Sequence, residues 1–75
     1  MTSINKRIKK LFDSPANVTI QELQIVLEYF GYRLGRVRGS HFIFTHHCRD
    51  TQSIPVHNNK IKKSYIKKLL KILYG

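Results

Sequence analysis

Apolar positions in three segments of the chain recur with the period of an α-helix. In residues 3–12 the apolar side chains are spaced three or four residues apart, which places them on one helical face. They are Ile4, Ile8, Leu11 and Phe12. Pro15 follows this segment, and proline disfavours helical backbone in the residue before it. The pattern therefore predicts a short helix over residues 3–12 that ends before Pro15.

The second helical segment carries both a start signal and a stop signal. Thr19 is followed three residues later by Glu22, the spacing of a capping box, in which each residue's side chain bonds the other's backbone N–H. Gly31 can end the helix because glycine readily adopts a left-handed conformation. The predicted buried stripe is Leu23, Val26, Leu27 and Phe30.

The middle of the chain loses the helical period and fits three β-strands, roughly 32–38, 41–47 and 53–58. A last helix is predicted over 60–74, with Asn58 and Asn59 offering an N-cap. Its apolar face is Ile61, Tyr65, Ile66, Leu69, Leu70 and Leu73. This order of elements predicts an α+β fold, with a three-stranded antiparallel sheet and helices on one face.

The turn between the first two strands predicts their register. Gly39-Ser40, with glycine first, fits a type II′ hairpin. Arg38 then lies opposite His41, Val37 opposite Phe42 and Arg36 opposite Ile43. The same register places Gly35 opposite Phe44.

A second turn, centred on Asp50, would place Asn59 opposite His41 and Ile54 opposite His46. Residues directly opposite each other share a face, and faces alternate along a strand. The two registers agree on an apolar face of Val37, Phe42, Phe44, Ile54 and Val56. The other face would carry Arg36, Arg38, His41, Ile43, Thr45, Pro55 and His57.

The polar face combines groups that can cleave RNA. In this register His41 and His57 are diagonal neighbours, roughly 7–8 Å apart at Cα. A histidine titrates near neutral pH and can take or give a proton. Arg36 and Arg38 can bind phosphate and stabilise developing charge. Such a face could cleave RNA through attack by its own 2′-hydroxyl without a metal, although a strand histidine is often only a polar surface residue. His57 could instead orient substrate or end its strand.

The charge of the chain points to a polyanionic partner. The 75 residues, enough for one domain, contain 14 Lys and Arg against 4 Asp and Glu, a formal charge of +10. Nucleic acid is the commonest partner of such a chain, and an anionic membrane surface is the rival. Lys60, Lys62 and Lys63 fall in the first turn of the predicted last helix, where cations oppose the helix dipole. A phosphate-binding site at the start of this helix would explain why lysines stand there. The alternative is that they only solvate one face of the helix.

Several other function classes find little support in the sequence. The one cysteine, Cys48, permits no internal disulfide and suits a reducing cytosol. No apolar run approaches the roughly 20 residues of a membrane span, and the N-terminus lacks a secretory h-region. We therefore expect a soluble cytoplasmic protein. His46-His47-Cys48 lacks the paired spacing of zinc sites, so we expect no metal and no cofactor.

The combined motifs resemble those of one bacterial family. A capped helix ends in Phe30-Gly31-Tyr32 and leads to Arg38-Gly39-Ser40-His41 and Phe42-Ile43-Phe44. Ile54-Pro55-Val56-His57 and a basic helix with Ile66, Lys67, Leu69 and Leu70 follow. Over roughly residues 18–73 the chain resembles the HicA toxins of toxin–antitoxin pairs. These are small mRNA interferases with a fold similar to double-stranded-RNA-binding domains.

The resemblance implies roles that the residues alone do not give. His41 matches the family's catalytic histidine after Gly-Ser. The implied activity is metal-independent cleavage of mRNA, neutralised by a cognate HicB-like antitoxin. The implied organisation is one HicA-like domain over 1–75, with an N-terminal extension over 1–14 and a core over 18–74. Two positions depart from the common pattern: Phe42 replaces a second histidine, and Ser64-Tyr65 replaces Gly-Thr.

Three functions therefore compete. The first is a ribonuclease toxin with His41 as general acid or base; its second acid–base group is either His57 or a lysine. Its RNA-binding residues would be Arg36, Arg38, His57, Lys60, Lys62 and Lys63. The second is a non-catalytic RNA-binding module, since duplex RNA is recognised by shape through phosphate contacts. The third is a membrane-surface protein acting through its basic amphipathic helix, which the capping box and strand run argue against.

Overall fold

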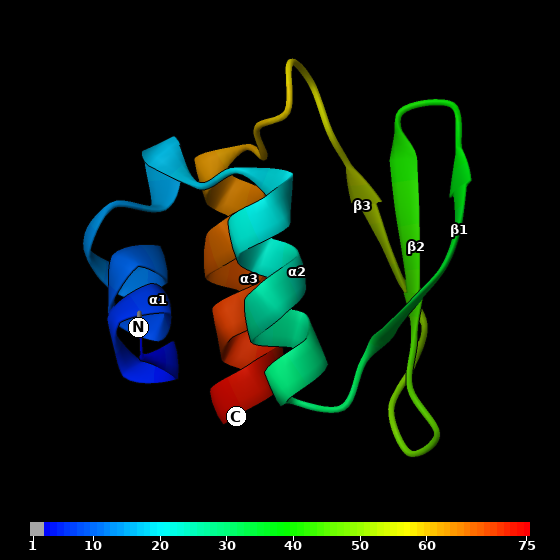
Figure 1. The fold of residues 1–75 in the computed structure, drawn as a ribbon, viewed down its shortest axis with the longest axis horizontal. Coiled ribbons are helices and arrows are strands. Elements are labelled where there is room, and N and C mark those ends of the chain that lie inside the picture. Colours follow the sequence, from blue (N-terminus) through cyan, green and yellow to red (C-terminus); the bar gives the residue numbers. More distant parts are fainter. Residues whose placement is uncertain (1–2) are drawn as a thin grey trace.

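The computed structural model describes residues 3–75 as three helices and a three-stranded sheet (Figure 1). Two α-helices precede the sheet, α1 (Ile4–Asp13) and α2 (Ile20–Tyr29), and the short 3₁₀ helix η1 (Pro15–Asn17) lies between them. The strands are β1 (Arg33–Arg38), β2 (His41–Thr45) and β3 (Gln52–Pro55), and α3 (Lys63–Tyr74) ends the fold. The sheet is antiparallel with order β1-β2-β3. The predicted α+β fold is confirmed. Residues 1–2 of the predicted N-terminal extension lie outside the described residues.

The helices gather on one side of the sheet. In Figure 1, α2 and α3 run side by side next to the strands, and α1 packs against both helices on the side away from the sheet. Most of the apolar positions predicted for the helices form one core with the inner face of the sheet; Ile4, Ile8, Phe30 and Tyr65 are only partly buried against it, and Phe12 is 53% exposed. The buried side chains of the core are Leu11, Val18, Ile20, Leu23, Val26, Leu27, Tyr32, Phe44, Ile54, Ile61, Ile66, Leu69, Leu70 and Leu73. Among the elements of residues 3–75, none lies on the opposite face of the sheet in Figure 1, and Arg36, Arg38 and His41 on that face are exposed.

The predicted start of α2 is confirmed in detail. Both halves of the capping box form: Glu22 N donates to Thr19 Oγ1 at 3.3 Å, and Thr19 N donates to Glu22 Oε1 at 3.1 Å. Gly31 ends the helix with a φ of 94°, a conformation that glycine adopts without the strain of a Cβ.

The predicted start of the last helix is wrong. Asn58 and Asn59 have φ values of 50° and 69° and occupy the centre of a tight turn. His57 and Lys60 close that turn with two backbone hydrogen bonds of 2.9 Å. Asparagine tolerates left-handed backbone, so two in sequence suit this turn better than a helix cap. Consequently α3 begins at Lys63, and Lys60 lies outside its first turn.

The first hairpin follows the predicted register as far as a bulge. Arg38 pairs with His41, Val37 with Phe42 and Arg36 with Ile43. Beyond them the register shifts, so that Leu34 and not Gly35 lies opposite Phe44. Gly35 is the extra residue of this irregularity, a position where glycine is common. The predicted pairing of Gly35 is therefore wrong.

The second hairpin is displaced from the predicted register. His41 pairs with Pro55 rather than Asn59, a difference of four residues. The loop that joins β2 to β3 is longer than a turn centred on Asp50 and runs from residue 46 to residue 51. Because four is an even number, the slip leaves each side chain on its predicted face.

The apolar face of the sheet is confirmed, except at one edge. Phe44 and Ile54 are fully buried, and Phe42 and Val56 are partly buried against the core. Val37 remains 49% exposed because it lies on the edge strand beside the hairpin tip. Alternation gives the face of a residue, and the extent of the helices decides how much of that face is covered.

An ion pair attaches α1 to the start of α2. Lys10 Nζ lies 2.6 Å from Glu22 Oε2. Burial raises the pKa of Glu22, but the hydrogen bonds from Lys10 and Thr19 and the charge of Lys10 outweigh it, so the net pKa is lowered. The charged carboxylate therefore stabilises the fold above the ordinary carboxyl pKa of about 4.3, and that contribution is lost as the pH falls through the folded-state pKa.

This pair gives a pH-dependent prediction. Glu22→Gln keeps an oxygen for the capping box and removes the charge. We expect it to lower the free energy of unfolding at pH 7 by less than about 1 kcal/mol, since Lys10 is well exposed. Urea titrations from pH 7 to pH 3 should show this difference shrinking toward zero at acid pH. A difference independent of pH would mean that the charge on Glu22 contributes nothing.

Candidate functional site

His41 is the first residue of β2 and lies on the open face of the sheet. A shallow hollow of about 280 Å³ adjoins it, lined by Arg38, His41, Ile43 and Ser53. These four residues come from all three strands. Arg38, His41 and Ser53 are exposed, and Ile43 is partly buried. An imidazole and a guanidinium therefore share a surface hollow open to a large substrate.

Local backbone geometry fixes this pairing of His41 with Arg38. A type II′ turn needs a positive φ at its first central residue and a negative φ at its second. Gly39 has a φ of 59°, and the φ of Ser40 is not positive, so the turn has the predicted type. The turn sets Arg38 directly opposite His41. Arg36 is also exposed on this face, two residues along the same strand, but it does not line the hollow. The Gly39-Ser40 turn thus brings Arg38, which precedes it, directly opposite His41, which follows it.

Ser53 is a site residue that the sequence reasoning missed. It lies opposite Ile43 on β3, which places it diagonally from His41. The predicted register put His57 at that position. Ser53 is anchored from the helical side, because Tyr65 Oη donates to its carbonyl oxygen at 2.5 Å. Tyr65 is one of the two positions where the sequence departs from the pattern it resembles, and here it ties α3 to the strand of the site.

His57 lies beyond the end of β3 and outside the hollow. The predicted register, with Asn59 opposite His41, put His57 opposite Ile43; that pairing is wrong, because His41 pairs with Pro55 and Ile43 with Ser53. His57 still belongs to the same end of the sheet as His41: Val56 N donates to Ser40 O at 2.8 Å, so the chain before His57 passes beside the first hairpin. Its side chain is exposed.

The three predicted lysines follow His57 along the chain, and all are exposed. Lys60 pairs with His57 across the tight turn and forms a second backbone bridge to Thr19. Lys62 is the N-cap of α3, makes no side-chain capping bond, and precedes Lys63, the first helical residue. The lysines thus form a basic segment that leads from the turn to the N-terminus of α3.

The cluster of His46, His47 and Cys48 has another explanation than a metal site. One ligand atom from each lies within 4.8 Å of the others. However, His46 Nε2 lies 3.0 Å from Phe30 O, and His46 Nδ1 accepts hydrogen bonds from Cys48 N and Arg49 N at 2.9 and 3.1 Å. Both ring nitrogens of His46 are therefore engaged in hydrogen bonds, which leaves His47 and Cys48 as ligands in this cluster of the described chain. A structural zinc site needs four ligands.

One comparison with known proteins gives a match. The family model described as "HicA toxin of bacterial toxin-antitoxin" matches residues 20–73. The chain belongs to the HicA toxin family. Neither the comparison with curated proteins nor that with solved structures gives a match. The predicted family is thereby confirmed.

Membership makes this HicA chain a toxin of a toxin–antitoxin system and implies a cognate antitoxin as its partner. The matched residues include α2, the whole sheet and the hollow beside His41. Helix α1 lies before the matched segment. No helix within residues 3–75 is both long and apolar enough to cross a membrane.

Proposed function

We propose that this HicA toxin is an endoribonuclease that cleaves mRNA without a metal ion, with His41 as a general acid or base. One observation carries the proposal: His41 is exposed beside a hollow on the open face of the sheet, directly opposite Arg38. Family membership supports the toxin role, and a toxin that cuts mRNA acts in the cytoplasm, where its substrate is translated.

The proposed reaction uses the RNA's own 2′-hydroxyl. A bond forms between this oxygen and the adjacent phosphorus, and the bond from phosphorus to the 5′-oxygen of the next nucleotide breaks. The products are a 2′,3′-cyclic phosphate and a 5′-hydroxyl. His41 takes the proton from the 2′-hydroxyl or gives one to the departing oxygen. Arg38 stabilises the charge that develops on the phosphate oxygens.

The second proton transfer falls to a group at the same end of the sheet. His57 is one candidate, and a lysine of the segment that follows it is the other. A histidine is better suited to both directions of transfer near neutral pH, because its ordinary pKa is about 6.5 and that of lysine about 10.4.

The RNA backbone would cross the site along exposed cations. The proposed phosphate contacts are Arg36, Arg38, His57, Lys60, Lys62 and Lys63. With a formal charge of +10, the protein attracts RNA at a distance and binds it in a salt-dependent manner. A cognate HicB-like antitoxin neutralises the toxin by covering this face.

The test is cleavage of a structured mRNA by purified protein in EDTA. We expect cuts in the presence of the chelator, and 3′ ends that accept poly(A) tailing only after their cyclic phosphate is removed. An RNA shift on a gel without any product would favour the alternative, a non-catalytic RNA-binding module. Cleavage that stops in EDTA and returns with added magnesium would refute the metal-independent reaction.

A further inference from the structure

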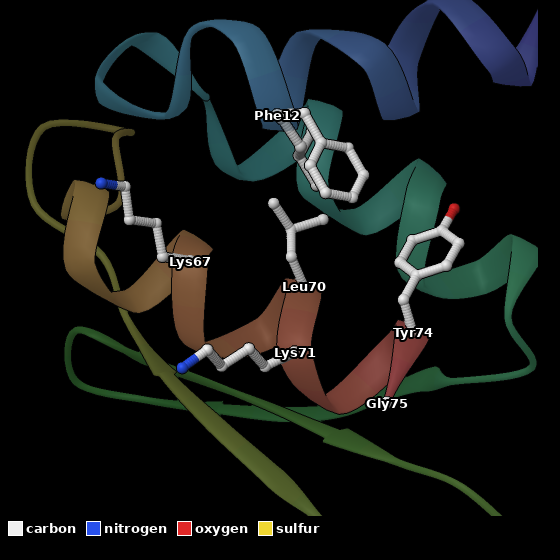
Figure 2. A pocket seen from close by; sticks show the side chains of 7 residues that line it. Phe12, Lys67, Leu70, Lys71, Tyr74 and Gly75 are labelled. Atoms are coloured by element: carbon white, nitrogen blue, oxygen red, sulfur yellow. The ribbon is translucent and has the colours of Figure 1, made fainter.

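A second surface lies on the helical side of the molecule, between α1 and α3. It is a groove of about 440 Å³, lined by Leu11, Phe12, Lys67, Leu70, Lys71, Tyr74 and Gly75. Figure 2 shows Leu70 near the middle, with the ring of Phe12 above it and that of Tyr74 beside it. The volume is within the range of about 300–1,000 Å³ that is typical of ligand pockets.

The groove has an apolar floor and half-exposed aromatic walls. Leu11 is fully buried and Leu70 is 7% exposed, whereas Phe12 and Tyr74 are 53% and 54% exposed. The two rings lie 5.6 Å apart at an angle of 55°, and Phe30 extends the row at 5.4 Å from Tyr74. Large apolar side chains that stay half-exposed side by side are typical of an interaction surface.

The charged groups that line the groove are cations. Lys67 and Lys71 are four residues apart on α3, so they lie on the same side of the helix. In Figure 2 their ammonium groups lie on the side of Leu70 opposite the ring of Tyr74. The occupant therefore meets an apolar surface on one side and two positive charges on the other.

These features favour a particular kind of occupant. A nucleobase stacks on a flat aromatic platform, but the rings of Phe12 and Tyr74 are tilted at 55° to each other over an aliphatic floor of Leu11 and Leu70. A second copy of this chain would bring another formal charge of +10 to the interface. We propose that the groove docks an acidic amphipathic helix of a protein partner. One large apolar side chain would seat over Leu70, and carboxylates one turn away would pair with Lys67 and Lys71.

This surface is separate from the proposed RNA site. Helix α1 packs against the helices on the side away from the sheet, as Figure 1 shows. The partner helix and RNA at His41 could therefore be bound at the same time. Because α1 lies before the residues matched by the family model, the groove is a feature of this chain beyond the matched segment. The proposal does not depend on whether the protein cuts RNA.

The test uses the full chain and a synthetic probe. The probe is a 16-residue amphipathic helical peptide of Leu, Phe, Ala and Glu; its scrambled form and a version with Lys for Glu are controls. We expect the acidic peptide alone to bind, measured by fluorescence anisotropy, and to shift the amide resonances of Leu11, Phe12, Leu70 and Tyr74.

Matched variants separate groove contacts from general charge. Lys71→Glu should weaken binding about tenfold, while Lys68→Glu, with the same net charge but outside the groove, should change it less than about twofold. Phe12→Ser should weaken binding about tenfold, and Tyr29→Ser, at a more exposed ring outside the groove, should not.

Three results would overturn the proposal. Equal effects of Lys71→Glu and Lys68→Glu would indicate non-specific attraction. Resonance shifts of the groove residues on adding a single-stranded oligonucleotide instead of the peptide would assign the groove to RNA. Concentration-dependent dimerisation that shifts the same residues would assign it to a second copy.

Discussion

The His41→Ala protein is expected to cleave RNA at least about 100-fold more slowly than wild type, because a positioned general acid or base contributes roughly 10²–10⁴ to such a rate. RNA binding should stay within about threefold, since Arg36, Arg38 and the lysines still contact the phosphates. His41 is exposed at the start of its strand, so the fold should be unchanged by circular dichroism. Single-turnover cleavage and filter binding measure the two effects separately.

Two further histidine variants make this experiment specific. His47→Ala removes an exposed imidazole from the loop before β3 and should leave the cleavage rate unaltered. His57→Ala should slow cleavage if His57 supplies the second proton transfer, and the acid or alkaline limb of the pH–rate profile should then disappear. If folded His41→Ala protein cuts at the wild-type rate, the proposed chemistry is wrong and the hollow beside Arg38 is a binding surface.

The open face of the sheet was predictable because side chains alternate between the two faces with a period of two. A register error of an even number of residues therefore leaves each side chain on its predicted face. The second register was wrong by four residues, yet His41, Ile43 and Pro55 still share the predicted face. An error of one residue would have set His41 opposite Ile54 or Val56, which belong to the apolar face. The face on which each side chain lies could therefore be predicted from the alternation of residues along its own strand.

The neighbours of His41 were less predictable because they depend on loop length. The sequence offered Asp50 as a turn centre, but the loop from residue 46 to residue 51 is held by contacts to α2 that no local pattern reveals. Ser53 consequently took the position opposite Ile43 that the predicted register had given to His57. The lysines were misplaced for a related reason: the two asparagines before them form a turn, although their side chains are equally good helix caps.

His46 is the residue that holds this loop in place. Its ring bridges Phe30 O, at the end of α2, and the backbone N–H groups of Cys48 and Arg49. Because Nδ1 accepts from two N–H groups, Nε2 carries the proton that is donated to the carbonyl. The ring also packs against Tyr32, with centroids 4.8 Å apart.

Gly31 makes room for the His46 ring. A Cβ at Gly31 would lie 2.9 Å from His46 Nε2, and the φ of 94° also disfavours other residues. The loop and the end of α2 are therefore fitted to each other, so that the start of β3, and with it Ser53, is set by a contact between distant segments.

His46→Ala should therefore destabilise the fold substantially without affecting the chemistry. The lost hydrogen bonds to Phe30 O and to the two loop amides, together with the lost contact with Tyr32, amount to about 2 kcal/mol. A domain of 60–100 residues loses about 4–8 °C in Tm per kcal/mol, so we expect a fall of about 8–16 °C. Thermal unfolding followed by circular dichroism measures this.

His46→Asn distinguishes the contributions within that loss. The Oδ1 of asparagine stands one bond beyond Cγ, as Nδ1 does in histidine, so it can still accept from Cys48 N and Arg49 N but cannot reach Phe30 O. Its Tm should fall between those of wild type and His46→Ala.

The control is His47→Ala, which removes a ring that only stacks on His46 at a centroid distance of 4.8 Å. It should lower the free energy of unfolding by less than about 0.5 kcal/mol. At a temperature where the His46→Ala protein is folded, its cleavage rate should match wild type, because His41 and Arg38 are held opposite each other by the hairpin of β1 and β2 and not by this loop. Equal Tm values for wild type and His46→Ala would show that the loop is set by other contacts, and the register of β3 would then need another cause.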